Sequence, residues 1–190
     1  MVREAVAAFG SLDLVLNGAG VMDGVPSGDP IDFANQRHLI FAQIHEAGDA
    51  YWENTFRTNS TGMFKSLRAE LKQMVAQRKG GSIVNVGSIA GLTGLAGNPA
   101  YVASKHAVNG LTRNAAVDYA PYGIRVNSVN MAATDTPMVA RAYEFVKWVM
   151  AQGHGASMAG AKSQSLLQIA DSQHRGATPW EQAAIILFLL

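Results

Sequence analysis

A tyrosine and a lysine four residues apart, Tyr101 and Lys105, are the pair whose types and spacing could perform acid-base chemistry. On a helix they would lie one turn apart on the same face. An ammonium group near a phenol favours the phenolate and lowers the tyrosine pKa from about 10 toward the range useful for proton transfer. Pro99 places the pair in the first turn of a predicted helix, where the helix dipole acts in the same direction. A simple surface pairing is the alternative explanation of this spacing.

Two further polar residues lie at positions compatible with a site. Ser88 follows an apolar run at the expected carboxyl end of a strand, although serine is also common in turns. Asn59 interrupts an apolar helical stripe, and a buried amide requires hydrogen-bond partners. From spacing alone, both a structural hydrogen bond and a functional role are open for Asn59.

The elements that would position these residues follow from the hydrophobic pattern. Nearly continuous apolar runs at Leu12–Leu16, Ser82–Val86 and Ile124–Val129 predict strands of a parallel sheet covered on both faces. Residues 101–119 predict a helix, and an earlier helix ending near residues 79–81 is predicted by the stripe Trp52, Phe56, Met63, Leu67, Leu71 and Met74. This alternation predicts an α/β fold with right-handed crossovers.

The composition predicts one domain spanning residues 1–190 and argues against several functions. Apolar residues make up 48% and charged residues 15%, so we expect extensive burial within or between subunits. A net charge of +1 without basic runs argues against nucleic acid as a partner, and the histidines lack metal-ligand spacing. The absence of cysteine excludes disulfides and a thiol nucleophile. With no signal peptide and no apolar run of about 18 residues, a cytoplasmic protein without a membrane partner is expected.

Three segments do not follow this regular pattern. The glycines at residues 18–24 follow a strand, but their spacing departs from the dinucleotide-binding fingerprint. Residues 140–178, rich in Gly, Ser and Ala at 153–165, predict a substrate lid, with a purely structural excursion as the alternative. The apolar run at 183–190 has no polar end, and the chain begins in what resembles a helix, so truncation at both ends is expected.

Taken in order, these motifs resemble the short-chain dehydrogenase/reductase family. The matching stretches are "NGAG" (17–20), "TNSTG" around Asn59, "VNVGSIAG" around Ser88, "YVASK" (101–105), and "IRVNSVN" followed by Thr136. The resemblance covers nearly the whole chain. It implies a Rossmann-like three-layer sandwich with a mostly parallel sheet, truncated at the N-terminus, and NAD or NADP as cofactor.

The resemblance also implies a role for each matching residue. Tyr101 would exchange a proton with the substrate oxygen, Lys105 would hold the ribose and depress the tyrosine pKa, Ser88 would hydrogen-bond the substrate oxygen, and Asn59 would anchor a proton-relaying water. The residues implied in cofactor binding are Asn17, Ala19, Gly20, Tyr101, Lys105, Thr134 and Thr136.

Three departures from the family pattern affect what can be expected. The glycine-rich phosphate loop, TGxxxGxG, would precede Met1, and it normally holds the pyrophosphate. Met131 and Ala132 replace the usual Pro-Gly, and Val21–Ala50 forms an unusually long connection near the expected site.

The leading hypothesis is an NAD(P)-dependent oxidoreductase that interconverts an alcohol with a ketone or aldehyde, assembled as a homodimer or homotetramer. One alternative is a truncated enzyme that performs cofactor-free proton transfer, as in isomerisation or cyclisation. The other is a non-catalytic protein for oligomerisation or interaction.

Overall fold

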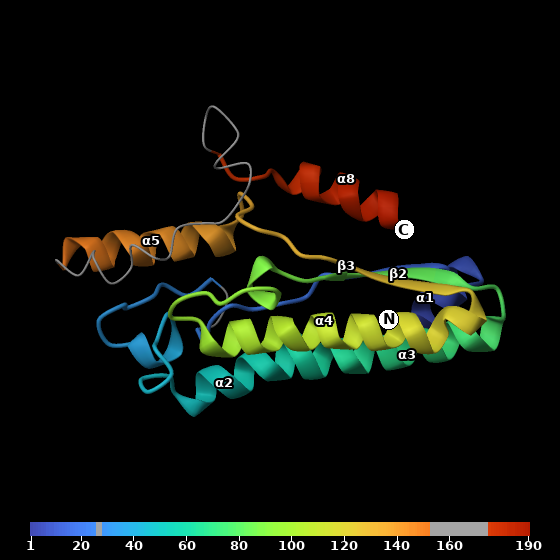
Figure 1. The fold of residues 1–190 in the computed structure, drawn as a ribbon, viewed down its shortest axis with the longest axis horizontal. Coiled ribbons are helices and arrows are strands. Elements are labelled where there is room, and N and C mark those ends of the chain that lie inside the picture. The colour runs from blue at the N-terminus through green and yellow to red at the C-terminus, as the bar shows by residue number, and fades with distance from the viewer. Residues whose placement is uncertain (26–27, 153–174) are drawn as a thin grey trace.

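A three-stranded parallel sheet forms the centre of the computed structural model, which describes residues 1–25, 28–152 and 175–190 (Figure 1). Its strands are β1 (Leu14–Asn17), β2 (Gly81–Val86) and β3 (Ile124–Val129), in the order β1-β2-β3. Both pairings are parallel, as predicted. The central strand is buried on both faces, because Ile83 packs into one hydrophobic cluster and Val84 into another.

Helices cover both faces of this sheet. The described α-helices are α1 (Val2–Phe9), α2 (Asp49–Phe56), α3 (Met63–Gln77), α4 (Pro99–Tyr119), α5 (Pro137–Ala151) and α8 (Pro179–Leu189). In Figure 1, α3 and α4 lie along one face of the sheet and α8 lies along the other. Short helical turns occur at η1 (Arg37–Leu39), η2 (Arg57–Gly62), η3 (Ile89–Gly91) and η4 (Ala120–Tyr122). The predicted three-layer α/β fold is therefore confirmed.

The layer between the sheet and the helices α3 and α4 is the larger aliphatic cluster, called here the first core. Its buried members are Met63, Leu67, Leu71, Met74, Ile83, Val108, Ala115, Ile124 and Val126. On the opposite face, Ile186 of α8 packs against Val84 and Val129. None of the described helices is long and apolar enough to cross a membrane.

The predicted stripe of the α2–α3 region is correct only in its second half. Trp52 is 47% exposed and stacks on Phe56 at 4.3 Å between ring centroids, whereas Tyr51 is buried. The segment η2 that joins α2 to α3 is π-helical, and a π turn takes up more residues than an α turn. The position in line with Met63 is therefore Tyr51 instead of Trp52.

A second core lies where the long connection after β1 meets α4 and α5. Its buried members are Met22, Ile40, Phe41, Ala90, Tyr101, Phe145 and Val149. The connection, called here the connecting loop, runs from Val21 to Gly48, because α2 begins at Asp49. Two residues of the predicted active-site segments, Ala90 and Tyr101, thus pack against this loop.

The predicted lid at residues 140–178 is in part an ordered helix. Residues 140–151 belong to α5, and residues 153–174 lie outside the described part of the chain. The segment before α5 and the segment before α8 are joined by a parallel β-bridge between Thr134 and Ala177. The Ala177 backbone N–H donates to the Ala133 carbonyl at 2.9 Å, and the Asp135 N–H donates to the Ala177 carbonyl at 2.8 Å.

Candidate active site

Ser88 and Tyr101 line one cavity of about 210 Å³ at the carboxyl end of β2. Ser88 lies two residues after the end of the strand, and Tyr101 lies in the first turn of α4. The connecting loop, the segment after β3 and α5 supply apolar walls, which include Met22, Phe41, Met131, Ala132, Met138, Val139 and Ala142. The two residues that replace the family's Pro-Gly, Met131 and Ala132, therefore face the same space as the tyrosine.

Burial determines the ionisation of Tyr101. Its side chain is 8% exposed, and burial raises the pKa of the phenol, which a hydrogen bond with the Ser88 side chain lowers in part. The expected depression of this pKa by Lys105 is wrong for this structure. The Lys105 Nζ lies 5.7 Å from the centroid of the tyrosine ring, and it donates to the Val86 carbonyl at 2.9 Å. The phenol is therefore protonated at neutral pH.

Lys105 is itself a strongly perturbed cation. Burial lowers its pKa from 10.5 to about 8, because the charged form has lost water. The loop after β1 approaches it closely: a Cβ at Gly20 would lie 3.5 Å from the Lys105 Nζ and 3.4 Å from the Asn59 Oδ1. Glycine at position 20 thus leaves space beside the ammonium group.

Asn59 holds the loop after β1 against α4. Its side chain is 1% exposed and lies in the π-helical segment. The Oδ1 accepts from the Val21 N–H at 2.8 Å, and the Nδ2 donates to the Val21 carbonyl at 2.8 Å and to the Ser104 Oγ at 3.0 Å. The amide therefore has the structural partners that its burial requires. The water-anchoring role implied by the family stays a prediction.

Among the residues predicted to bind cofactor, several side chains have structural partners. The Asn17 Nδ2 donates to the Glu70 Oε2 at 2.9 Å and to the Asn85 Oδ1 at 3.0 Å. Ala19 is exposed next to Gly20. The cofactor contacts expected of Asn17, Ala19 and Gly20 stay a prediction.

The two threonines predicted to bind cofactor stabilise the start of α5. The Thr136 Oγ1 caps the helix by accepting from the Val139 N–H at 3.4 Å, and it donates to the Thr134 carbonyl at 3.3 Å. The Thr134 Oγ1 donates to the Ala132 carbonyl at 3.2 Å. Their contact with the cofactor stays a prediction.

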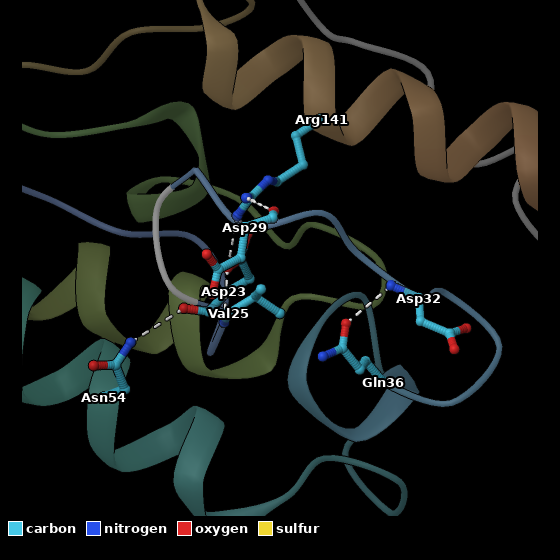
Figure 2. Close-up of polar contacts among 7 residues, drawn as sticks. All are labelled: Asp23, Val25, Asp29, Asp32, Gln36, Asn54 and Arg141. Atoms are coloured by element: carbon cyan, nitrogen blue, oxygen red, sulfur yellow. Dashed lines mark hydrogen bonds and ion pairs between the residues drawn. The ribbon is translucent and has the colours of Figure 1, made fainter.

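A partly buried ion pair joins the connecting loop to α5, and sequence reasoning missed it. Figure 2 shows Arg141 directed at Asp23, with its Nη1 3.2 Å from the Asp23 Oδ2 and its Nη2 donating to the Asp29 carbonyl at 2.9 Å. Asn54 of α2 also donates to the Asp23 carbonyl, at 3.3 Å. The chain neighbours Met22 and Ala142 line the cavity. The pair, called here the charged clamp, thus fixes two walls of the site.

Comparison with known proteins establishes the class. The sequence profile of the short chain dehydrogenase family matches residues 1–147. A 3beta-hydroxysteroid dehydrogenase of Mediterraneibacter gnavus is 37% identical, with 99% of this chain and 63% of the relative aligned. A cyclohexanol dehydrogenase of Acinetobacter sp. is 37% identical over 73% of this chain and 49% of its own length. This chain therefore belongs to the short-chain dehydrogenase family.

Solved structures agree with this assignment. Levodione reductase superposes with a TM-score of 0.73 at 27% identity, over 99% of this chain and 63% of the reductase. NAD+-bound xylitol dehydrogenase superposes with a TM-score of 0.72 at 26% identity, over 99% of this chain and 65% of that protein. This chain thus spans about two-thirds or less of the length of these relatives.

Proposed function

We propose that this chain carries the catalytic part of an NAD- or NADP-dependent oxidoreductase that interconverts a secondary alcohol and its ketone. The observation that carries the proposal is the buried, protonated Tyr101 hydrogen-bonded with Ser88 at the wall of an apolar cavity. An acid held in its neutral form at neutral pH can donate a proton to a carbonyl oxygen. An aldehyde and a primary alcohol would follow the same chemistry.

In the reductive direction, the Ser88 hydroxyl would hydrogen-bond the substrate carbonyl oxygen and orient it toward the Tyr101 hydroxyl. Tyr101 donates its proton to that oxygen as the carbon accepts hydride, and it takes the proton back in the oxidative direction. A nicotinamide, when bound, would supply or accept the hydride. The Lys105 Nζ, 5.7 Å from the centroid of the tyrosine ring, would hold the ribose of the nucleotide beside this pair.

The residues around Lys105 fit the ribose and nicotinamide portion of a dinucleotide. Gly20 lies beside the lysine ammonium and the Asn59 amide, and a sugar hydroxyl that approached there would find a cationic donor. The loop of residues 17–20 follows the carboxyl end of β1, where ligands bind in open α/β sheets. Thr134 and Thr136 complete the proposed cofactor contacts.

The cavity walls favour an alicyclic substrate. Its lining is dominated by Met, Ala, Leu, Ile and Val side chains, and Ser88 and Tyr101 are accompanied by the polar residues Thr93, Asn98 and Tyr143. A ring that carries one hydroxyl or carbonyl group would bury its carbons there and present its oxygen to this pair. The names of two relatives, a hydroxysteroid and a cyclohexanol dehydrogenase, support the same substrate class.

We also propose a cytoplasmic homodimer or homotetramer that associates through the outer surface of α2, α3 and α4. Trp52, Phe64 and Val117 on these helices are exposed apolar side chains, and large exposed apolar surfaces favour association. Light scattering of the purified chain tests this proposal, and a monodisperse monomer would contradict it.

The test of the proposed function is binding and turnover with the 190-residue chain. We expect calorimetric binding of NADH or NADPH and oxidation of the nucleotide by cyclohexanone or a steroid ketone. Absence of both would contradict the proposal. Turnover that persists after the nucleotide is stripped would favour cofactor-free proton transfer instead, and assembly without any turnover would favour an interaction protein.

A further inference from the structure

The first turn of α4 has two backbone donors that need a partner from outside the helix. The N-terminal N–H groups of a helix have no acceptor within it. Pro99 has no N–H, and the Asn98 N–H donates to the Leu95 carbonyl at 3.2 Å. The remaining donors are the N–H groups of Ala100 and Tyr101, at the second and third helical positions. These are the groups that an N-cap side chain normally accepts from.

Asn98 occupies the N-cap position but does not cap the helix. Asparagine is among the best capping residues, yet its side chain makes no capping bond here. Its Nδ2 instead donates to the Ala96 carbonyl at 2.9 Å, and its Oδ1 is buried without a partner. The backbone explains this, since Asn98 has φ −129° and ψ 51°, outside the extended region that N-cap residues adopt.

The connecting loop accounts for this backbone conformation. Gly97, immediately before Asn98, has φ +71°, a left-handed conformation that favours glycine. A Cβ at Gly97 would lie 3.0 Å from the Phe41 carbonyl oxygen. Contact with Phe41 of the second core thus fixes the bend that turns the Asn98 amide away from the helix end.

Tyr51 of α2 supplies the missing acceptor. Its hydroxyl accepts from the Tyr101 N–H at 3.4 Å and also from the Ala100 N–H. The side chain is 0% exposed, so water does not compete for these two donors. Burial raises the pKa of Tyr51 to about 12, with a further contribution from the nearby Asp23 charge, and the group stays a neutral phenol at neutral pH.

We propose that Tyr51 is the N-terminal cap of α4 and thereby a positioning residue for Tyr101. Tyr101 lies in the first turn, where the cap acts, whereas Lys105 lies one turn further along. Fraying of the first turn would move the Tyr101 phenol away from Ser88 and leave the lysine in place. The consequence for catalysis rests on the proposed function, but the capping itself does not.

Amide hydrogen exchange tests the cap without any assumption about activity. In the unmutated chain, we expect the Ala100 and Tyr101 amides to be protected, although first-turn amides normally exchange fast. In Tyr51→Phe their exchange should accelerate by about 10- to 100-fold, the effect of leaving buried donors unpaired. Tyr122→Phe is the matched control, because it removes an exposed phenolic hydroxyl near the other end of α4. Unprotected amides in the unmutated chain, or equal exchange in both variants, would overturn the proposal.

The ionisation of Tyr101 distinguishes positioning from general stabilisation. With ¹³Cζ-labelled tyrosine, the Tyr101 titration midpoint should fall toward 10 in Tyr51→Phe, because the frayed turn admits water to a phenol whose pKa burial raises. Turnover should show a lower kcat with an unchanged KM for the nucleotide. An unchanged midpoint would contradict the positioning role. Absence of turnover in the unmutated chain would contradict the proposed function but not the cap.

A comparison of unfolding free energies adds a second test that does not depend on Tyr51→Phe remaining folded. Asn98→Ala should lower the urea midpoint less than a typical N-cap substitution does, because the Asn98 side chain makes no capping bond. If Asn98→Ala instead lowers the unfolding free energy as much as a typical N-cap substitution does, and the Ala100 and Tyr101 amides exchange faster, Asn98 is the cap. That result would overturn the proposal.

Discussion

The two hydrophobic cores of this protein differ in the secondary structure of the segments that form them. The first core joins regular helices and strands through aliphatic side chains, and its buried cluster holds no aromatic residue. The second core joins an irregular loop to the start of α4 and to α5, with Phe41 stacked on Phe145 at 4.5 Å between centroids. It also contains Tyr101. The comparison indicates that the regular helices and strands around the first core determine the fold, and that the second core shapes the candidate active site.

Their polar contacts differ in the same way. Beside the first core, Asn17, Glu70, Asn85 and Thr112 form a hydrogen-bonded chain between strands and helices, and burial raises the pKa of Glu70. The second core is instead tied by the charged clamp and by the Tyr51 cap, which hold the cavity wall at Met22 and the first turn of α4. Changes in the second core should therefore alter catalysis more than folding.

The largest effect should come from Tyr101→Phe. Removal of the proposed proton donor should lower kcat by about 10²- to 10⁴-fold, the usual contribution of general acid catalysis. The free energy of unfolding should change little, because the ring stays packed in the second core. Steady-state assays together with urea unfolding measure both quantities. Retained turnover would show that Tyr101 is not the proton donor and that it contributes only to the packing of the second core.

Leu71→Ala should have the opposite profile. Leu71 is buried in the first core, and loss of a buried leucine costs about 2–5 kcal/mol of unfolding free energy. We expect a lower urea midpoint with kcat per folded molecule unchanged, since Leu71 does not line the cavity. A change in kcat larger than the change in folded fraction would show that the two cores are not separable.

The sequence predicts the strands and the buried helical stripe of the first core well, because both follow from the hydrophobic pattern of neighbouring residues. The continuous apolar runs identify all three strands, with β3 matched at both ends and β1 displaced from Leu12–Leu16 to Leu14–Asn17. The interruption of an apolar stripe by Asn59 predicts a buried amide, and the structure places it there. These signals depend on neighbours within a few turns of the chain.

The second core could not be predicted in the same way. Asp23 and Arg141 are 118 residues apart, and no pattern links them. The π-helical segment turns Tyr51 inward, a rotation that an α-helical period cannot anticipate. The spacing of Tyr101 and Lys105 indicates proximity but not burial, so the direction of the tyrosine pKa shift was predicted wrongly. Solvent exclusion depends on tertiary packing, which local spacing does not encode.

A pH dependence of stability should follow from Lys105, which extends from α4 toward the end of β2. Its pKa of about 8 lies below the unfolded value of 10.5, so the native state binds fewer protons than the unfolded state between these values. Stability should therefore rise by about 2 kcal/mol from pH 8 to pH 10. Above pH 10 the raised pKa values of Tyr101 and Tyr51 act in the opposite direction.

Urea unfolding at several pH values checks this, with Lys105→Met as the comparison. The methionine variant should lack the rise between pH 8 and 10. An equal rise in both proteins would assign the effect to another group. It would also indicate that the Lys105 ammonium is better solvated in the folded protein than its buried position implies.

The smallest effect should come from a change in the charged clamp. This change tests whether the clamp contributes more to the shape of the cavity than to the stability of the protein. Asp23→Asn keeps the size of the side chain and its hydrogen-bond acceptor but removes the charge opposite Arg141. Because Arg141 is partly exposed, we expect a loss of about 1 kcal/mol in unfolding free energy, between the values for surface and buried pairs. Glu144→Gln, which breaks an exposed ion pair with Lys147 on the same helix, is the matched control and should change little.

The kinetic consequence of Asp23→Asn should fall on binding, because the clamp holds Met22 and Ala142 in the cavity walls and touches neither Ser88 nor Tyr101. The KM for an alicyclic alcohol should rise about 5-fold, the equivalent of 1 kcal/mol, with kcat nearly constant. A double-mutant cycle with Arg141→Met assigns the effect to the pair. Additive losses, or a fall in kcat at constant KM, would mean that the cavity walls are held by the aromatic packing of the second core and not by the charged clamp.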